Sequence, residues 1–232
     1  MVQFALWPLV LAALLNLERR AFAQSMLSRP LVTGTIIGLA LGNLEQGLLL
    51  GLWSELLWLW QLPVGGDYTP NCGIAVSVGL ISTNLSTTYL ELVPPNRPLL
   101  MVAFFLIPVI SHLAIYLDKF TRTLSRNLSI VLENKLALGD KVNFPLLNLW
   151  GVFHTFWVAL LFLIVMVALT CLFYYWLGQI LPDLAWAPFQ KFYPYAPVVG
   201  LLGVGASLAR PAYRPYILGL GCGFLFSLAK FC

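Results

Sequence analysis

The sequence has 232 residues, of which 60% are hydrophobic and only 9% are charged, and its formal net charge is +4. Soluble domains carry roughly 25% charged residues, so this composition excludes an ordinary soluble protein and predicts an integral membrane protein. The positive charge is too small and too dispersed for nucleic-acid binding. It fits instead the excess of basic residues that membrane proteins carry on their cytoplasmic side.

Apolar runs of unequal length follow one another along the chain. They cover residues 2–17, 31–42, 47–64, 73–93, 98–117, 144–177 and 198–231. A membrane-spanning helix needs about 20 apolar residues, a length that several of these runs reach. The first run has no basic segment before it and no small-residue cleavage site after it, so we expect an uncleaved span rather than a signal peptide. The sequence predicts an all-α, polytopic transmembrane protein with a single membrane domain over residues 1–232.

The second and third runs are short, and a polar, glycine-containing segment over residues 42–47 separates them. Short or interrupted hydrophobic segments are typical of discontinuous or re-entrant helices at a transporter's binding site. Non-helical backbone at membrane depth is tolerated only inside protein or beside water. We therefore expect residues 29–93 to form a substrate-binding core with broken helices.

One carboxylate lies inside the third run. Glu55 has no other charged residue near it in the sequence, because the neighbouring charges are Glu45 and Asp67. A carboxylate in hydrocarbon costs on the order of 2.5–3.5 kcal/mol or more, so it normally faces a partner, a cavity or a substrate. We interpret Glu55 as a substrate-binding residue.

A break in the apolar pattern follows Glu55, at residues 63–68, and a helix start follows the break. We expect Thr69 to be the N-cap of that helix, with Pro70 at its first position and Asn71 next. A helix N-terminus buried in protein offers unpaired N–H groups and the positive end of the helix dipole. Such groups suit a sugar, whose hydroxyls both donate and accept hydrogen bonds.

The predicted sugar site has two principal residues. Glu55 could accept two hydroxyl protons, and Asn71 can both donate and accept. The other candidates lie between them and supply an amide or shape the loop: Gln61, Gly65, Gly66 and Asp67. The alternative for Asp67 is that it only stabilises a turn and does not contact the substrate. Three tryptophans offer flat faces to a sugar ring or else face lipid: Trp53, Trp58 and Trp60.

Residues 118–143 carry five basic and three acidic residues, with apolar residues at three- and four-residue spacing. This pattern predicts an amphipathic cytoplasmic helix, which either links two moving parts or is a solvated loop helix. Residues 144–232 are expected to form a C-terminal helical part. If residues 144–177 formed one helix, it would be about 51 Å long, whereas the hydrocarbon core of a membrane is about 30 Å thick. We therefore expect either a bend near Gly151 or a helix that begins along the membrane interface.

The sequence shows no catalytic, nucleotide-binding or metal-binding motif, and we expect no cofactor. His112 and His154 lie in separate apolar runs, and each is either a packing residue or a pH-sensitive group. An intramembrane enzyme would need a nucleophile–base pair at recognisable spacing, which is not found. The cysteines form no CxxC pair and are expected to be free thiols: Cys72, Cys171, Cys222 and Cys232.

Residues 29–77 form one motif with fixed spacing. Its parts are Arg29-Pro30-Leu31-Val32, GLALGNLEQGLLLG from Gly38 to Gly51, Glu55-Leu56-Leu57, Gly65, Pro70-Asn71 and Ala75-Val76-Ser77. Together they resemble the membrane subunit IIC of the mannose-family sugar phosphotransferase systems. The rest of the chain agrees with that family in length and hydropathy only.

The resemblance implies an elevator-like permease subunit that binds and translocates a mannose-type hexose across a bacterial inner membrane with a IID partner. Separate cytoplasmic IIA and IIB components would phosphorylate the sugar, and the heteromeric unit would form a homo-oligomer. The phosphoryl-carrying residues belong to IIA and IIB, so none is expected here. Asn43 and Asn71 stand where the family usually has aspartate. The alternative function is therefore a non-transporting scaffold or regulatory subunit of such a complex.

Overall fold

The computed structural model describes residues 2–19, 26–58, 69–89, 96–139, 143–180 and 186–208. Within these ranges the secondary structure is helical and contains no strand, which confirms the predicted all-α class. The helices in chain order are α1 (Val2–Glu18), α2 (Pro30–Ala40), α3 (Leu44–Trp58), α4 (Cys72–Tyr89), α5 (Asn96–Ala137), α6 (Phe144–Ile180), α7 (Ala187–Phe192), the 3-10 helix η2 (Tyr193–Tyr195) and α8 (Ala196–Leu208).

Helices α2 and α3 form a tight hairpin. They contain 11 and 15 residues, so each is shorter than the about 20 residues that a full span needs. The turn between them uses Gly42, whose φ of +73° lies in the left-handed region that glycine adopts readily. Gly34 and Gly38 pack directly on Gly47, and a Cβ atom at any of these three positions would overlap backbone. The predicted broken helices are therefore present, and their glycines allow two backbones to touch.

Helix α4 lies at the centre of the assembly, because residues 72–83 are all buried and the helix contacts α1, α2, α3, α5 and α6. Two of its buried hydroxyls donate to backbone carbonyls of the same helix. The Ser77 hydroxyl donates to the Gly73 carbonyl at 2.9 Å, and that of Ser82 donates to the Val78 carbonyl at 2.7 Å. These two buried hydroxyls are thus satisfied locally, as a membrane interior requires.

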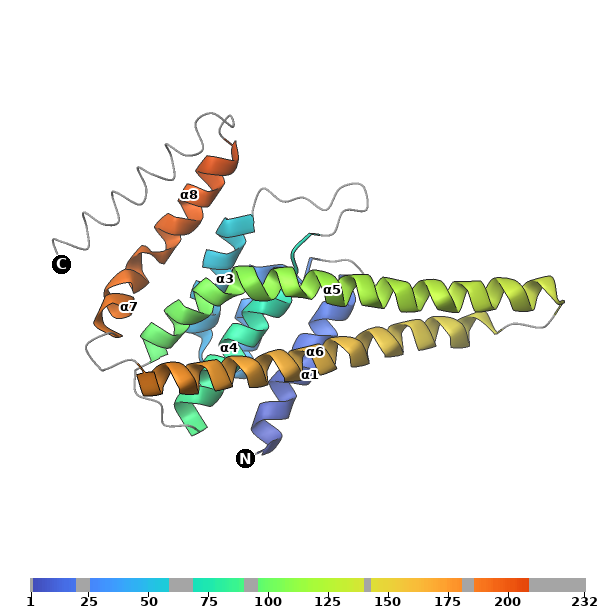
Figure 1. Ribbon diagram of the computed structural model, residues 1–232, viewed down its shortest axis with the longest axis horizontal. Coiled ribbons are helices and arrows are strands. Elements are labelled where there is room, and N and C mark those ends of the chain that lie inside the picture. The colour runs from blue at the N-terminus through green and yellow to red at the C-terminus, as the bar shows by residue number, and fades with distance from the viewer. Residues whose placement is uncertain are drawn as a thin grey trace.

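Helices α5 and α6 run side by side in opposite directions and extend past the other helices as a long arm (Figure 1). Both are long and apolar enough to cross a membrane, over Arg97–Ala137 and Phe144–Ile180. The predicted amphipathic helix over 118–143 is the outer part of α5 as far as Ala137, and is continuous with the apolar run before it.

Helix α6 is unbroken at Gly151, so the bend that we expected there is absent. With 37 residues, α6 is about 56 Å long, which exceeds the hydrocarbon core by roughly 25 Å. Its first turns instead pack along the outer part of α5 in the arm, so the extra length extends beyond the rest of the bundle (Figure 1).

Candidate functional site

Polar side chains gather where four helix segments meet. The last turn of α1, the first turns of α2 and α4 and the last turns of α3 converge beside the middle of α5. This cluster contains both principal residues of the predicted sugar site.

Glu55 has the partner that its position in an apolar run led us to expect. Its Oε1 lies 3.0 Å from Nη1 of Arg29, and its Oε2 accepts a hydrogen bond from the backbone N–H of Leu31 at 3.3 Å. Leu31 belongs to the first turn of α2, where the helix dipole favours a negative charge. The side chains of Glu55 and Arg29 remain 17% and 35% exposed, so the ion pair is only partly enclosed.

Asn71 is fully buried and its side-chain amide is engaged on both sides. Its Oδ1 accepts from the backbone N–H of Ile74 at 3.3 Å, and its Nδ2 donates to Oδ1 of Asn16 at 2.8 Å. The first contact is that of an N-cap residue, since α4 begins at Cys72. The prediction that Thr69 is the N-cap was wrong: the helix starts later, because the Asn71 side chain caps it while bonded to α1.

Arg19 holds the segment that precedes α4. Its Nη2 donates to the carbonyl and to the hydroxyl of Thr69, at 2.9 and 2.7 Å, and its Nη1 donates to the carbonyl of Pro70 at 3.4 Å. The Nε of Arg19 also lies 3.8 Å from Oδ2 of Asp118 on α5, a carboxylate that is almost wholly enclosed. Arg19 therefore connects α1, the start of α4 and α5.

Glu55 and Asn71 lie on either side of a close contact between the start of α4 and the residues before α2. A Cβ atom at Gly73 would overlap the carbonyl oxygen of Ser28, so the first turn of α4 touches the residues that precede α2. The backbone N–H of Ser28 donates to Oε2 of Glu18 at 2.9 Å. Glu18 and Glu55 thus each accept from a backbone N–H at this entry to α2, beside the helix that Asn71 caps.

The sequence analysis missed several members of this cluster. Asn16, Glu18, Arg19 and Asp118 were given no role, although each is a polar or charged residue at or near the end of an apolar run. That position was the available signal. The other predicted site residues lie outside the described part of the chain: Gln61, Gly65, Gly66 and Asp67.

The tryptophans separate into different environments. Trp53 is 1% exposed and packs edge-on against Phe104 and Tyr193, with ring centroids 5.6 and 5.2 Å apart. It is a core residue, so neither sugar stacking nor lipid contact describes it in this structure. Trp58 packs against the same core, and Trp60 lies outside the described residues.

Each of the two histidines contacts a backbone carbonyl of its own helix. Nδ1 of His112 lies 2.7 Å from the carbonyl of Pro108, and Nδ1 of His154 lies 2.9 Å from that of Trp150. Among the described residues no group of His, Cys, Asp or Glu could hold a metal ion. Cys72 and Cys171 are free thiols, as predicted; the other two cysteines lie outside the described ranges.

Replacing Asn71 with alanine is expected to destabilise the protein by about 1–2 kcal/mol, since it removes an N-cap and a buried hydrogen bond. Asn71→Ser is expected to lose about half as much, because serine is an equally good N-cap acceptor although it gives up the hydrogen bond to Asn16. Thermal unfolding of the purified variants in one detergent checks both expectations. Equal losses in the two variants would contradict the capping role.

The chain is similar to a known family and to a curated protein. A family model described as the PTS (phosphotransferase system) sorbose-specific IIC component matches residues 1–224. Among curated proteins, the "Putative N-acetylgalactosamine permease IIC component 2" of Escherichia coli (strain K12) is 43% identical over 51 residues, which are 22% of this chain and 38% of that protein. The chain therefore matches well under half of that relative's length.

Proposed function

Because the chain belongs to the sorbose-specific IIC family of the phosphotransferase systems, as the motif at residues 29–77 predicted, we propose that it binds and translocates a mannose-type hexose. It is a membrane protein of a sugar permease family. The finer proposal is a multi-pass subunit of a bacterial inner membrane that works with a IID-like membrane partner. Cytoplasmic IIA and IIB components would phosphorylate the sugar, and the heteromeric unit would form a homo-oligomer.

The observation that carries the proposal is the partly exposed ion pair between Glu55 and Arg29, at the start of α2. A carboxylate offers about four acceptor sites, and Glu55 uses one on Arg29 and one on the N–H of Leu31. The remaining sites can accept protons from neighbouring sugar hydroxyls. The guanidinium of Arg29 can donate to the oxygens of the same hydroxyls, so the pair matches the mixed donor and acceptor character of a sugar.

Asn71 would act by positioning the start of α4 rather than by contacting the sugar in the conformation described, because it is fully buried. Residues 59–68 join the helix of Glu55 to the segment in which Asn71 caps α4. We propose that they complete the site through the residues predicted from sequence: Gln61, Gly65, Gly66 and Asp67.

One observation favours a second function, a non-transporting scaffold or regulatory subunit. The family's usual aspartate at position 71 is replaced by an amide whose two polar atoms both serve the fold, so this position offers no free carboxylate to a sugar. The second function predicts a stable complex with a IID-like partner that forms without sugar and supports no uptake.

The experiment that separates the two functions begins with purification of the chain from its native membranes in mild detergent, with identification of co-purifying proteins. The recovered complex is then expressed in cells that lack hexose uptake. Uptake of radiolabelled mannose, glucose, sorbose and N-acetylgalactosamine is measured with and without IIA and IIB. Uptake of any of these sugars supports the permease. A stable complex without uptake in every combination supports the scaffold.

A further inference from the structure

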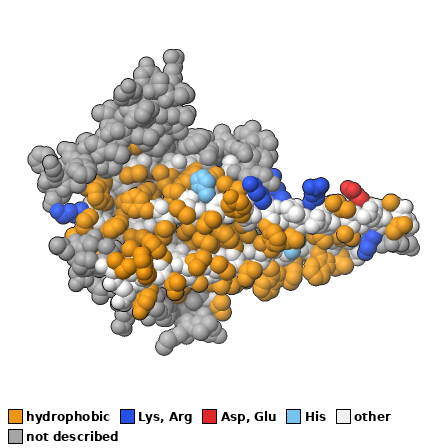
Figure 2. Space-filling view, in the orientation of Figure 1, with side chains coloured by type: hydrophobic (Ala, Val, Ile, Leu, Met, Phe, Trp, Pro, Cys, Tyr) orange, Lys and Arg blue, Asp and Glu red, His pale blue; other side chains and the backbone are white. Residues whose placement is uncertain are grey.

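The first turns of α6 carry a stripe of large apolar side chains on the outside of the arm. Its members recur at three- and four-residue spacing, and each is more than half exposed: Leu146, Leu149, Trp150, Phe153 and Trp157. The ring of Phe153 packs edge-on against Trp150 and Trp157, with centroids 5.6 and 5.9 Å apart. In Figure 2 apolar side chains gather along one long edge of the arm, and most Lys and Arg side chains in view lie along the other. We call these five residues the apolar stripe.

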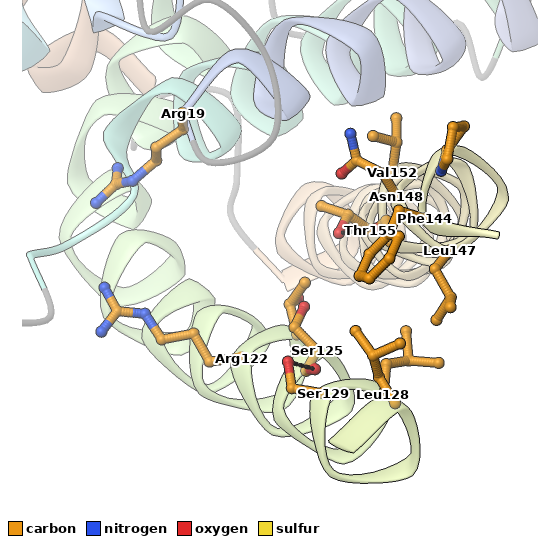
Figure 3. A pocket seen from close by; sticks show the side chains of 14 residues that line it. Arg19, Arg122, Ser125, Leu128, Ser129, Phe144, Leu147, Asn148, Val152 and Thr155 are labelled. Atoms are coloured by element: carbon orange, nitrogen blue, oxygen red, sulfur yellow. Dashed lines mark hydrogen bonds between the residues drawn. The ribbon is translucent and has the colours of Figure 1, made fainter. Parts of the chain in front are cut away.

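The neighbouring part of α5 places the apolar stripe outside the hydrocarbon core. Leu128 of α5 and Leu147 of α6 line one cavity and point toward each other in Figure 3, so the two helices are level here. At this level α5 exposes Arg126 and Glu133. Charged side chains are costly inside a bilayer, so both helices of the arm lie outside it at this point.

The straightness of α6 also keeps the apolar stripe away from the membrane surface. The helix is unbroken over 37 residues and is long and apolar enough to cross a bilayer. When its later turns cross, its first turns leave the bilayer at the same angle and cannot lie flat on the lipid (Figure 1). A contiguous patch of large apolar side chains outside lipid marks a protein interaction site. The apolar stripe therefore requires a protein that covers it.

A cavity of about 580 Å³ between α1 and α6 adjoins the apolar stripe. Four members of the stripe line this cavity together with Leu14 and Leu17 of α1, and the lining is apolar. It can receive a large apolar side chain from another helix. The stripe itself contains no glycine, alanine or serine, the small residues that let two helices approach closely. A complementary helix must therefore bring small residues opposite the rings and a large apolar side chain for the cavity.

A second copy of this chain does not supply that complement at α6. Two copies in one membrane have the same orientation, so α6 would run parallel to its counterpart in a two-fold pair. Each residue near the two-fold axis would then meet its own copy. Trp150 would face Trp150, and Phe153 would face Phe153, so the bulky rings would hold the two helices apart. A different chain is free of this restriction.

We propose that the apolar stripe is the docking surface for an apolar helix of the IID-like membrane subunit. This helix continues past the bilayer beside the arm and places small residues opposite Trp150, Phe153 and Trp157. One of its large apolar side chains enters the cavity between α1 and α6. The identity of the partner rests on the proposed function, whereas the need for a protein cover rests on the stripe alone.

Site-directed photocrosslinking tests this contact without sugar and without uptake. Phe153 in the stripe is replaced by benzoylphenylalanine, and Phe173, near the other end of α6, is replaced in the same way as the control. The products formed in cells that make the native complex are identified by mass spectrometry. We expect a cross-link to a IID-family subunit from position 153 and none from position 173.

The other products separate a wrong docking surface from a wrong function. A cross-link from position 153 to a second copy, to another part of this chain or to lipid alone would overturn the docking assignment. Equal cross-linking to the IID subunit from both positions would overturn it as well. If the IID subunit co-purifies with the chain but does not cross-link at 153, only this inference fails. If no IID subunit co-purifies, the partner in the proposed function is also wrong.

Two tryptophans of α6 provide matched variants. Trp150 and Trp176 are 55% and 57% exposed, and each lies beside a phenylalanine three residues away, with ring centroids 5.6 and 6.4 Å apart. Trp150→Ala is expected to weaken binding of the purified IID subunit about 30-fold, as truncation of an interface hot spot does, and Trp176→Ala by less than about twofold. Thermal unfolding of the isolated chain should be the same for both variants. Equal affinities of the two variants for the IID subunit would overturn the assignment.

Discussion

Glu55→Gln is expected to lower hexose binding and uptake by about 10- to 100-fold, because a hydrogen bond to a charged group contributes about 1.5–3 kcal/mol. Glutamine keeps the shape of the side chain and one oxygen that can accept from Leu31, so the start of α2 should stay in place. It loses the negative charge that attracts Arg29 and that accepts strongly from sugar hydroxyls. Sugar binding to the purified complex and uptake in cells measure the two effects.

Glu45→Gln is the matched control, since Glu45 is an exposed carboxylate on the same helix, in the first turn of α3. Its uptake should remain within about twofold of the unchanged protein, as surface charge pairs contribute little. The thermal stability of both variants should stay close to the parent's. Full uptake by Glu55→Gln would remove Glu55 from the binding site, whereas a loss shared by both variants would point to assembly rather than to sugar recognition.

A double-mutant cycle asks whether Glu55 and Arg29 act as one unit. Arg29→Gln alone leaves Glu55 with the Leu31 N–H but without its counter-ion. If both residues bind the sugar as one unit, the double variant should bind it little worse than either single variant does. The effects of mutations at neighbouring residues of one hydrogen-bond network are not additive. Losses that simply add would show two independent roles.

The broken helices and the need of Glu55 for a partner could be predicted because their causes are local. A short apolar run, a turn glycine and an isolated carboxylate are visible without knowing the fold. The same reasoning predicted a helix start close to Asn71 but named Thr69, rather than Asn71, as the N-cap. The choice between Thr69 and Asn71 depends on Arg19 and Asn16, which lie about fifty residues away and reach across from α1.

The rest of the polar cluster could not be predicted because its pairs are distant in sequence. Arg19 meets Asp118, and Arg29 meets Glu55, through helices that pack side by side. Hydrophobic periodicity shows that a helix has a buried face but not which helix covers it. The bend expected near Gly151 of α6 is absent for a related reason: the bound of about 30 Å applies to a helix inside the bilayer, and α6 continues into the arm alongside α5.

Gly47→Leu is expected to disrupt the α2–α3 hairpin and to destabilise the protein by about 3 kcal/mol or more, because the new side chain has no space. A Cβ atom there would overlap the carbonyl of Gly34 and would lie 2.7 Å from the Cα of Gly38. Both obstacles are backbone, so the helices must move apart. Glu55 lies about two turns along α3 and would be drawn away from Arg29, so sugar uptake should fall with stability.

Graded and matched variants separate this clash from a general effect of larger side chains. Gly47→Ala adds one carbon and should lower stability by about 1–3 kcal/mol. Gly151→Leu is the control, because no atom lies within 4 Å of a Cβ atom at this helical position. It should leave the unfolding temperature unchanged or raise it, since leucine favours helix more than glycine does. If Gly47→Leu unfolds at the same temperature as Gly151→Leu, the close approach of α2 and α3 does not hold Glu55 in place, and the site must be fixed by the Arg29 and Leu31 contacts alone.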